Sequence, residues 1–308
     1  GLTYKILVTG GAGFIASHLS DHLVNKGHEV IIADNLSSGR LDYINCRAKF
    51  YKLNIKDDKL EKVIAREKPQ FIYHFAAQVN VARSQQDPGF DADNNIAGTL
   101  KILSHALKYQ ISKVIFASSA AVYGNPLYLP LDESHPANPV SFYGLSKYTA
   151  ECYIRMYNLL LGLQYTILRF ANVYGPRQQA AGDGGVIAQF VSRYTGGEDI
   201  IIQGNGEQTR DFIYVGDVVA ACINALHRGD NQTFNISTGQ AVSINELGGL
   251  FNRLNQSHTL PLHVPGRAGD IMHSRLDNSK AGKILLWSPR ISLNQGLERT
   301  CGKQAGLL

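Results

Sequence analysis

The sequence predicts an α/β protein, built as a doubly wound parallel sheet with a smaller mixed α/β lobe in the C-terminal part. Three observations carry this prediction. Apolar strand-like runs alternate with helical patterns in the first half, a glycine-rich turn directly follows the first run, and the alternation ends after about residue 172. Because successive parallel strands need a crossover connection, such alternation favours a parallel sheet that helices cover on both faces.

The elements follow one another in a regular order. The apolar strand candidates are residues 5–9, 29–33, 50–52, 71–74, 113–118 and 164–169. The helical patterns between them lie near residues 14–26, 57–66, 92–109 and 143–161. A further strand and helix are expected over residues 211–227. The predicted domains are therefore residues 1–172 with 211–235 for the sheet, and residues 173–210 with 236–308 for the smaller lobe.

Composition narrows the class of protein. The chain has 308 residues, of which 44% are hydrophobic and 18% charged, so it is long enough for a large domain with an additional lobe. The net charge of +5 comes without a long basic run, and no apolar stretch is long enough to span a bilayer, so neither nucleic acid nor membrane is an expected partner. The four cysteines are scattered and no signal peptide is visible, which favours reduced thiols and a cytoplasmic location.

The turn after the first strand candidate carries the first functional signal. Its glycines, Gly10, Gly11 and Gly13, allow a tight turn, and the helix that follows offers N–H donors and a positive dipole end to a pyrophosphate. The second strand ends at Asp34, whose carboxylate can accept hydrogen bonds from the ribose hydroxyls and would repel a 2′-phosphate. The pattern predicts a Rossmann-like domain that binds NAD in preference to NADP.

A tyrosine and a lysine carry the second signal. Tyr143 stands four residues before Lys147, so both side chains lie on one face of a helix, where the ammonium group favours the phenolate. Tyr109 and Lys113 have the same spacing but lie at the opposite end of the strand that leads to Ser119. Ligands of open parallel sheets bind beyond the carboxyl ends of the strands, which selects Ser119, Tyr143 and Lys147 as the catalytic candidates.

Together these motifs resemble the extended short-chain dehydrogenase/reductase superfamily, and within it the nucleotide-sugar epimerases of the UDP-glucose 4-epimerase type. The segments that carry the resemblance are 9–15, 34–39, 74–77, 93–99, 118–124, 143–147, 169–177, 206–212 and 266–270. These segments are distributed along nearly the whole chain and follow one another in the family's order. The resemblance implies NAD as cofactor, a UDP-sugar as substrate, and a homodimer formed through the helices at 92–109 and 143–161.

The resemblance also implies roles for individual residues. For the cofactor it implies Gly10, Gly13, Phe14, Ile15, Asp34, Asn35, Ser37, Gly39, Asn54, Ile55, Phe75, Ala76, Ala77, Asn95, Ser118, Tyr143, Lys147 and Phe170. For the substrate it implies Ser119, Tyr143, Asn172, Val186, Gln203, Arg210, Arg267, Asp270 and Ser274. Arg210 and Arg267 are the expected diphosphate ligands, since a guanidinium offers a planar fork of donors. No metal is expected, because His18 and His22 have the spacing of ligands but lack a third partner.

Two alanines limit the reaction. Dehydratases and decarboxylases of this superfamily carry acidic residues just after the catalytic serine or threonine, whereas this chain has Ala120 and Ala121, which transfer no protons. We therefore predict an NAD-dependent UDP-hexose 4-epimerase that interconverts UDP-glucose and UDP-galactose through a 4-keto intermediate. The small side chain of Ser274 leaves room for UDP-GlcNAc and UDP-GalNAc as well. A UDP-glucuronate or UDP-pentose 4-epimerase is the alternative enzyme, and a non-catalytic NAD-binding regulator is the alternative from another class.

Overall fold

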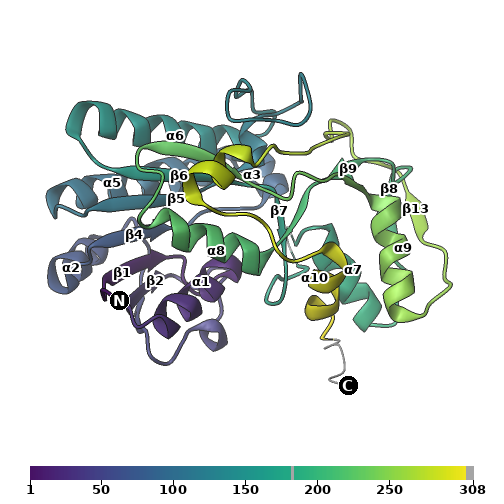
Figure 1. Ribbon diagram of the computed structural model, residues 1–308, viewed down its shortest axis with the longest axis horizontal. Helices are drawn as coiled ribbons and strands as arrows, with labels where there is room; N and C mark the ends of the chain where they lie inside the picture. Colours follow the sequence, from purple (N-terminus) through teal and green to yellow (C-terminus); the bar gives the residue numbers. More distant parts are fainter. Residues whose placement is uncertain (182–183, 303–308) are drawn as a thin grey trace.

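A seven-stranded parallel sheet forms the centre of the molecule, in the strand order β11-β6-β5-β4-β1-β2-β3 (Figure 1). The computed structural model describes residues 1–181 and 184–302. The strands of this sheet are β1 (Lys5–Thr9), β2 (Glu29–Asp34), β3 (Lys49–Lys52), β4 (Phe71–His74), β5 (Lys113–Ser119), β6 (Tyr165–Phe170) and β11 (Gln232–Ile236). The order reverses between β1 and β4, and the predicted doubly wound parallel sheet is thereby confirmed.

Helices cover both faces of the sheet. On one face lie α1 (Phe14–Asn25) and α8 (Val215–Ala225), and on the other lie α2 (Asp58–Glu67), α5 (Gly98–Lys108) and α6 (Phe142–Leu161) (Figure 1). Each face has its own apolar cluster, and the central strands contribute alternate side chains to the two. Because the central strands are buried on both faces, they appear in the sequence as largely apolar runs, whereas the edge strand β3 is partly exposed.

The helical pattern at 92–109 is interrupted, which the sequence did not predict. Its first part is the π-helical turn η2 (Asp93–Ala97), and only then does it become α5. Two short helices that the sequence did not predict, α3 (Val81–Gln86) and α4 (Pro88–Ala92), precede it. Inside that turn the buried Asn95 accepts a hydrogen bond from the Gln78 backbone N–H and donates to the Gln78 carbonyl. A π-helical turn of this kind often marks a functional site. The other predicted helices and strands differ by one or two residues at their ends.

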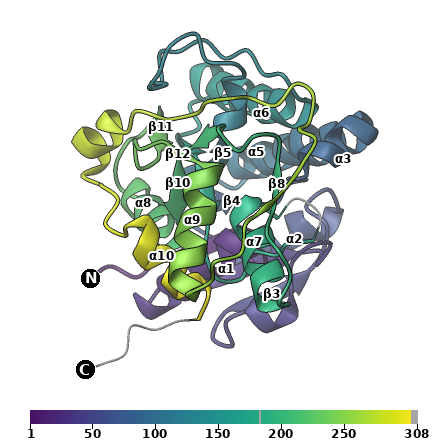
Figure 2. The same cartoon turned by 90° about the vertical axis from the view of Figure 1, so that its right-hand side faces the viewer.

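The smaller lobe carries short strands and helices at one end of the sheet, as Figure 2 shows. Its strand pairs are β7 (Asn172–Tyr174) with β10 (Phe212–Tyr214), β8 (Ile201–Gln203) with β13 (Leu262–Val264), and β9 (Thr209–Arg210) with β12 (Val242–Ser243). Its helices are α7 (Val186–Thr195), α9 (Ile244–Asn255) and α10 (Leu293–Thr300), and they enclose a third apolar cluster. The short helical turns η1 (Leu41–Tyr43), η3 (Ala120–Val122) and η4 (Ala281–Leu285) complete the chain. The exact domain boundaries stay a prediction.

Two further expectations concern the chain as a whole. In the described part of the chain, no helix combines the length and the apolarity that a membrane span requires. The cysteines at positions 46, 152, 222 and 301 are all free thiols.

Candidate active site

The glycine turn lies against the loop that follows β4. Gly10 has a φ of +69°, and a Cβ atom there would lie 2.8 Å from the backbone nitrogen of Ala76. The turn therefore requires glycine both for its left-handed backbone and for the close approach of the two chain segments. Gly13 then forms the N-cap of α1 without a side-chain cap. The helix N-terminus is thus left accessible at the cavity that Gly10 and Gly13 line.

This cavity has a volume of about 530 Å³ and extends along the carboxyl ends of the strands. Most of the residues predicted for the cofactor line it, namely Gly10, Gly13, Phe14, Ile15, Asp34, Asn35, Ser37, Asn54, Ile55, Phe75, Ala76, Ala77, Ser118, Tyr143 and Phe170. Its size and its glycine-lined mouth at a helix N-terminus fit an elongated dinucleotide.

The remaining predicted cofactor residues lie behind the cavity wall. A Cβ atom at Gly39 would lie 2.8 Å from the Cβ of Ala12, so this glycine packs against the glycine turn. Asn95 is buried and holds the backbone of Gln78, which does line the cavity. Lys147 is also buried, beneath the cavity floor. The structure therefore places these three residues as supports of the lining.

Asp34 lies at the end of β2, where its carboxylate lines the cavity while being largely buried. The carboxylate accepts hydrogen bonds from the backbone N–H groups of Ala12, at 3.0 Å, and Leu36, at 2.7 Å. Burial raises the pKa of this carboxyl group, and the two backbone hydrogen bonds partly oppose that shift. The carboxylate is thus fixed in position by the glycine turn on one side and by its own loop on the other.

A buried chain of hydrogen bonds shapes the loop after β4. The Nδ1 atom of His74 lies 2.7 Å from the Thr9 hydroxyl, and its Nε2 atom lies 3.0 Å from the Thr99 hydroxyl. The Thr9 oxygen also accepts hydrogen bonds from the backbone N–H groups of Phe75 and Ala76. Burial lowers the pKa of His74 to about 3, so the ring is neutral near pH 7. These contacts hold the segment that faces Gly10.

Two of the three catalytic candidates, Ser119 and Tyr143, line the cavity beside the end of β5, and the third, Lys147, is buried on α6 outside that lining. Ser119 ends that strand, and its Oγ accepts a hydrogen bond from the Ala121 N–H at 3.1 Å. Tyr143 lies in the first turn of α6 and lines the cavity with Ser119. Lys147 donates from Nζ to the carbonyl of Ala117 at 2.9 Å. Burial lowers the pKa of Lys147 to about 8.

A buried ion pair supports this end of the site from behind. Glu151, one turn after Lys147 on α6, accepts two hydrogen bonds from Arg169, at 3.0 and 2.7 Å. Its Oε2 also accepts the Ser118 hydroxyl at 2.5 Å. The hydrogen bonds and positive charge of Arg169 hold the pKa of Glu151 below its usual range despite burial. The network fixes α6 to β5 next to Ser119.

The second tyrosine–lysine spacing does not form a pair. Tyr109 donates to Glu61, whereas Lys113 donates to the carbonyls of Ala225 and Arg228. Both residues lie at the amino end of β5, remote from the cavity. The structure thus gives Tyr109 and Lys113 separate partners, while the catalytic role of Tyr143 and Lys147 stays a prediction.

The predicted substrate residues outside the catalytic set gather in the smaller lobe. Arg210 ends β9, Gln203 ends β8, and Val186 begins α7. Ser274 donates its backbone N–H to the carbonyl of Thr209 at 3.2 Å, which places it next to β9. Asn172 begins β7 and donates its backbone N–H to the carbonyl of Asp211.

Arg210 is the most buried of the predicted cationic ligands. Its Nη1 donates to the carbonyl of Thr209 at 2.7 Å, and burial lowers the pKa of its guanidinium, while the nearby carboxylate of Asp270 acts in the opposite direction. Arg267 and Asp270 are exposed on the loop after β13. None of these small-lobe residues is among the described residues that line the 530 Å³ cavity. The structure therefore does not bring the two groups of predicted residues together in this one cavity.

Sequence reasoning missed several residues of the cavity wall. These are Gln78, Asn80, Arg83, Phe90 and Asn94 from the segment after β4, and Arg177, Gln178 and Gln179 from the loop after β7. Arg83 lies 3.9 Å above the ring of Phe90, and Arg177 is held by Asp21 and Ser17 of α1. The interrupted helix before α5 brings the first group to the cavity, and no sequence signal marked that interruption.

The expectation about metals concerns His18 and His22. No group of three or more histidine, cysteine, aspartate or glutamate side chains within residues 1–181 and 184–302 is placed to hold a metal ion. His18 instead lies with Nε2 at 2.8 Å from the carbonyl of Pro176.

The chain is similar in sequence to a known enzyme family and to individual members with known names. The sequence model of the NAD dependent epimerase/dehydratase family matches residues 6–237. The UDP-glucose 4-epimerase of Mycolicibacterium smegmatis is 40% identical over 303 residues, covering 96% of this chain and 97% of that protein.

Solved structures agree with the sequence match. The UDP-glucose 4-epimerase of Thermotoga maritima, solved with UDP-glucose, superposes with a TM-score of 0.95 at 42% identity, covering 97% of this chain and 98% of that one. The UDP-N-acetylglucosamine 4-epimerase of Methanobrevibacter ruminantium, solved with UDP-N-acetylmuramic acid, superposes with a TM-score of 0.94 at 34% identity, covering 98% of each chain.

Proposed function

This chain belongs to the NAD-dependent epimerase/dehydratase family, and we propose that within this family it is a UDP-hexose 4-epimerase. The proposed reaction interconverts UDP-glucose and UDP-galactose through a 4-keto intermediate, with UDP-GlcNAc and UDP-GalNAc as further substrates. The observation that carries the proposal is the grouping of Ser119 and Tyr143 in the cavity wall, with Lys147 buried beneath and only alanines at positions 120 and 121.

The cavity suits the cofactor of this family. Gly10 and Gly13 would lie against the pyrophosphate at the N-terminus of α1, and Asp34 would accept hydrogen bonds from the adenosine ribose. When bound, NAD⁺ supplies the acceptor for a hydride from the sugar. The protein's own contribution is to hold the nicotinamide end near Ser119 and Tyr143 and to manage the proton.

The proton is the task of the tyrosine. We infer that the Tyr143 phenolate accepts the proton of the sugar 4-hydroxyl while Ser119 hydrogen-bonds the same oxygen. The positive charge of Lys147 favours the phenolate, and its own carbonyl contact with Ala117 fixes its position. Return of the proton, with the hydride added to the other face of the keto sugar, completes epimerisation.

The neighbours of Ser119 argue against the other reactions of the family. Elimination of water needs an additional acid and base near the sugar. Ala120 and Ala121 form the turn η3 directly after Ser119 and carry only methyl groups. This supports epimerisation as the net reaction, in which one oxygen loses and regains one proton.

The smaller lobe supplies the proposed contacts to the nucleotide. We propose that Arg210 and Arg267 bind the diphosphate and that Asp270 faces the uridine ribose. Asn172, Val186 and Gln203 complete the proposed substrate contacts. Burial of Arg210 suits a diphosphate ligand, since charge-assisted hydrogen bonds are strongest where water is excluded.

A turnover assay tests the proposal. Purified protein with NAD⁺ is incubated with UDP-galactose, UDP-GalNAc, UDP-glucuronate or a UDP-pentose, and the sugars are then separated. We expect C4 epimers of the hexoses. Turnover of only UDP-glucuronate or only the UDP-pentose would show that this sugar, and not a UDP-hexose, is the substrate. NAD binding without any turnover would indicate a non-catalytic regulator.

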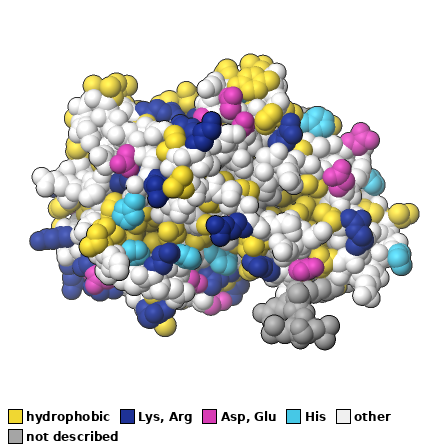
Figure 3. All heavy atoms as spheres, in the orientation of Figure 1, with side chains coloured by type: hydrophobic (Ala, Val, Ile, Leu, Met, Phe, Trp, Pro, Cys, Tyr) yellow, Lys and Arg dark blue, Asp and Glu magenta, His cyan; other side chains and the backbone are white. Residues whose placement is uncertain are grey.

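We further propose a homodimer in the cytoplasm. The outer face of α6 exposes an apolar stripe made of Leu145, Tyr153, Met156 and Leu160. Figure 3 shows apolar side chains gathered over the end of this helix at the top left of the view. A stripe at helical spacing is suited to packing against the same helix of a second copy. Light scattering of the wild type and of Met156→Glu tests this assembly.

A further inference from the structure

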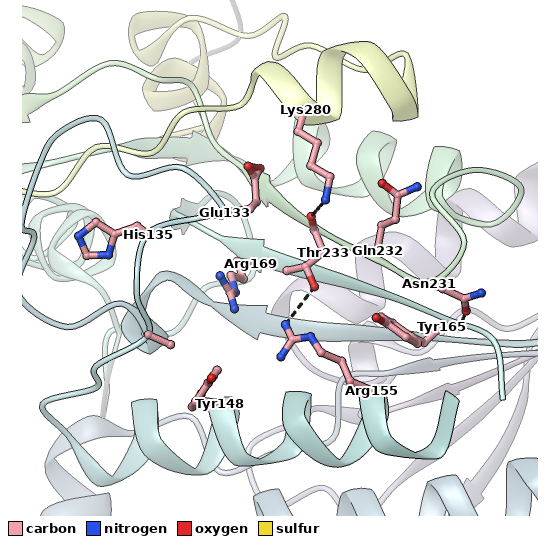
Figure 4. A pocket seen from close by; sticks show the side chains of 11 residues that line it. Glu133, His135, Tyr148, Arg155, Tyr165, Arg169, Asn231, Gln232, Thr233 and Lys280 are labelled. Atoms are coloured by element: carbon pink, nitrogen blue, oxygen red, sulfur yellow. Dashed lines mark hydrogen bonds between the residues drawn. The ribbon is translucent and has the colours of Figure 1, made fainter. Parts of the chain in front are cut away.

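A second cavity lies along the edge strand β11 and, among the described residues, shares no lining residue with the cofactor cavity (Figure 4). Its volume is about 390 Å³, and it is bounded by α6, β6, β11 and the residues that lead into η4. None of its lining residues has a part in the proposed reaction. Its wall is mainly polar and strongly cationic.

Three cations from different elements converge on this cavity. Arg155 comes from α6, Arg169 from β6, and Lys280 from the N-cap of η4. In Figure 4, Arg155 and Lys280 approach Thr233 from opposite sides. Arg155 Nη2 donates to the Thr233 hydroxyl at 3.1 Å, and Lys280 Nζ donates to the Thr233 carbonyl at 2.8 Å. The two charges are therefore held on either side of one edge-strand residue.

The carboxylates nearby do not balance these cations. Glu151 binds both Arg155 and Arg169, and Glu133 is the one carboxylate among the described residues that line the cavity. Three cations therefore face two carboxylates. Glu133 is itself committed to the backbone N–H of Asn235, at 3.0 Å. The cavity thus keeps a net positive charge.

Donor capacity is also left over. Arg155 Nη2 donates to Glu151 and to Thr233, and the guanidinium also interacts with the Tyr165 hydroxyl, although it has five N–H donors. Within the described residues, Lys280 Nζ donates to the Thr233 carbonyl, although an ammonium group has three donors. Burial lowers the pKa of Lys280, the carboxylate of Glu133 opposes this shift, and repulsion from Arg169 and Arg155 adds to it. An anion between Arg155 and Lys280 would relieve this repulsion and satisfy the spare donors.

We propose that this cavity binds a phosphate group, held between Arg155 and Lys280 next to Thr233. Phosphate offers several acceptor oxygens and a charge that two converging cations can match. The cavity volume of about 390 Å³ exceeds what a phosphate ion fills, and Tyr148, Tyr165 and Thr233 also line it. A small organic group esterified to the phosphate could therefore lie against these side chains. The occupant is thus either inorganic phosphate or a small phosphate ester.

The proposed site is connected to the catalytic end of the sheet. Arg155 and Arg169 both donate at 2.7 Å to Oε1 of Glu151, whose other oxygen accepts the hydroxyl of Ser118. Ser118 lines the cofactor cavity. An anion that draws Arg155 away from Glu151 would therefore change the contacts of Glu151, which holds the Ser118 side chain in the wall of the cofactor cavity.

Calorimetric titration tests the proposal on the full chain. The probes are inorganic phosphate and sn-glycerol 3-phosphate, against chloride at equal ionic strength, with NAD⁺ and UDP present to fill the other site. We expect binding by the wild type, at least about tenfold weaker binding by Lys280→Gln and Arg155→Gln, and unchanged binding by the control Lys101→Gln on the surface of α5. Tighter binding of the ester than of phosphate would identify an organic occupant.

A gain-of-binding variant makes the test sharper. Glu133→Gln removes a negative charge from the wall and can still accept from Asn235, so this variant should bind phosphate more tightly than the wild type. Thermal unfolding of each variant without phosphate shows that it is folded. The proposal is overturned if the wild type binds no phosphate, if Lys280→Gln binds it as well as Lys101→Gln does, or if Glu133→Gln binds it less tightly.

Discussion

Lys147 donates from its buried ammonium group to the carbonyl of Ala117 at 2.9 Å, two residues before Ser119 on the same strand. This contact joins the first turns of α6 to the end of β5. It fixes the helix that presents Tyr143 relative to the strand that presents Ser119. The proposed proton-transfer group is therefore held in part by a helix–strand hydrogen bond whose donor, Lys147, is itself a member of that group.

Replacing Tyr143 by phenylalanine should lower kcat by roughly 10²–10⁴-fold, because the ring remains but the proton acceptor is lost. Binding of NAD⁺, followed by fluorescence of the protein, should change little. Tyr153→Phe on the exposed face of the same helix is the matched control. Equal activity of the two variants would exclude Tyr143 as the base.

Replacing Lys147 by methionine should move the acid limb of the pH–kcat profile to higher pH. The reason is that a phenol without a neighbouring ammonium group needs a higher pH to ionise. The pKa of Lys147 is lowered to about 8, so in the free protein its charge is present below that pH and is lost above it. Lys101→Met serves as control. An acid limb at the same pH in Lys147→Met would contradict the proposed pairing.

Asp34→Asn should weaken NADH binding by about tenfold and improve NADPH binding relative to NADH, since the change removes the charge that repels a 2′-phosphate. The amide oxygen can still accept from the backbone of Leu36 or Ala12, so the loop should keep its shape. Fluorescence titrations with both cofactors measure the ratio. An unaltered ratio would mean that another residue sets the preference.

Ser274→Tyr should reduce turnover of UDP-GalNAc relative to UDP-galactose, because a bulky ring beside β9 would occupy the space of an N-acetyl group. Ser274 is tied to Thr209 by its backbone N–H, so the position of the new side chain is set by the strand. Ser279→Tyr, at an exposed position nearby, is the control. The size prediction fails if the substrate ratio of Ser274→Tyr equals that of the control.

His74→Gln should lower the free energy of unfolding at pH 7 by about 1–3 kcal/mol, because it disturbs the buried contacts with Thr9 and Thr99. It should also remove a pH dependence. Folding lowers the pKa of His74 from 6.5 to about 3, so the unfolded chain binds the extra proton between these values. Wild-type stability should therefore fall as pH drops below 6.5, by up to about 1.4 kcal/mol per pH unit.

Urea unfolding at pH 7 and pH 5 measures both effects. His258→Gln, at an exposed position, should leave the stability unchanged at pH 7. If wild type and His74→Gln lose equal stability between these pH values, the buried histidine does not cause the acid sensitivity.

The sequence predicted the parallel sheet and most of its helices because the signals are local. A strand buried on both faces is a continuous apolar run, and a glycine turn before a helix has few structural alternatives. The interruption before α5 was missed for a physical reason. Its π-helical turn depends on the contact between Asn95 and Gln78, which lie 17 residues apart. No local pattern encodes that contact, and with it Arg83 and Phe90 in the cavity wall were missed as well.

By itself the sequence determined which segments form strands and helices, the glycine turn, the acid at the end of β2 and the tyrosine–lysine spacing. Each of these features depends on residues that are close together in the chain. Only the tertiary structure decided that Tyr143 lines the cavity while the buried Lys147 does not. It also decided that Glu151 connects Ser118 to Arg169 and Arg155, and that Lys280 meets Arg155 across β11. Such contacts join residues from separate elements, and their distances follow from how the sheet and helices pack.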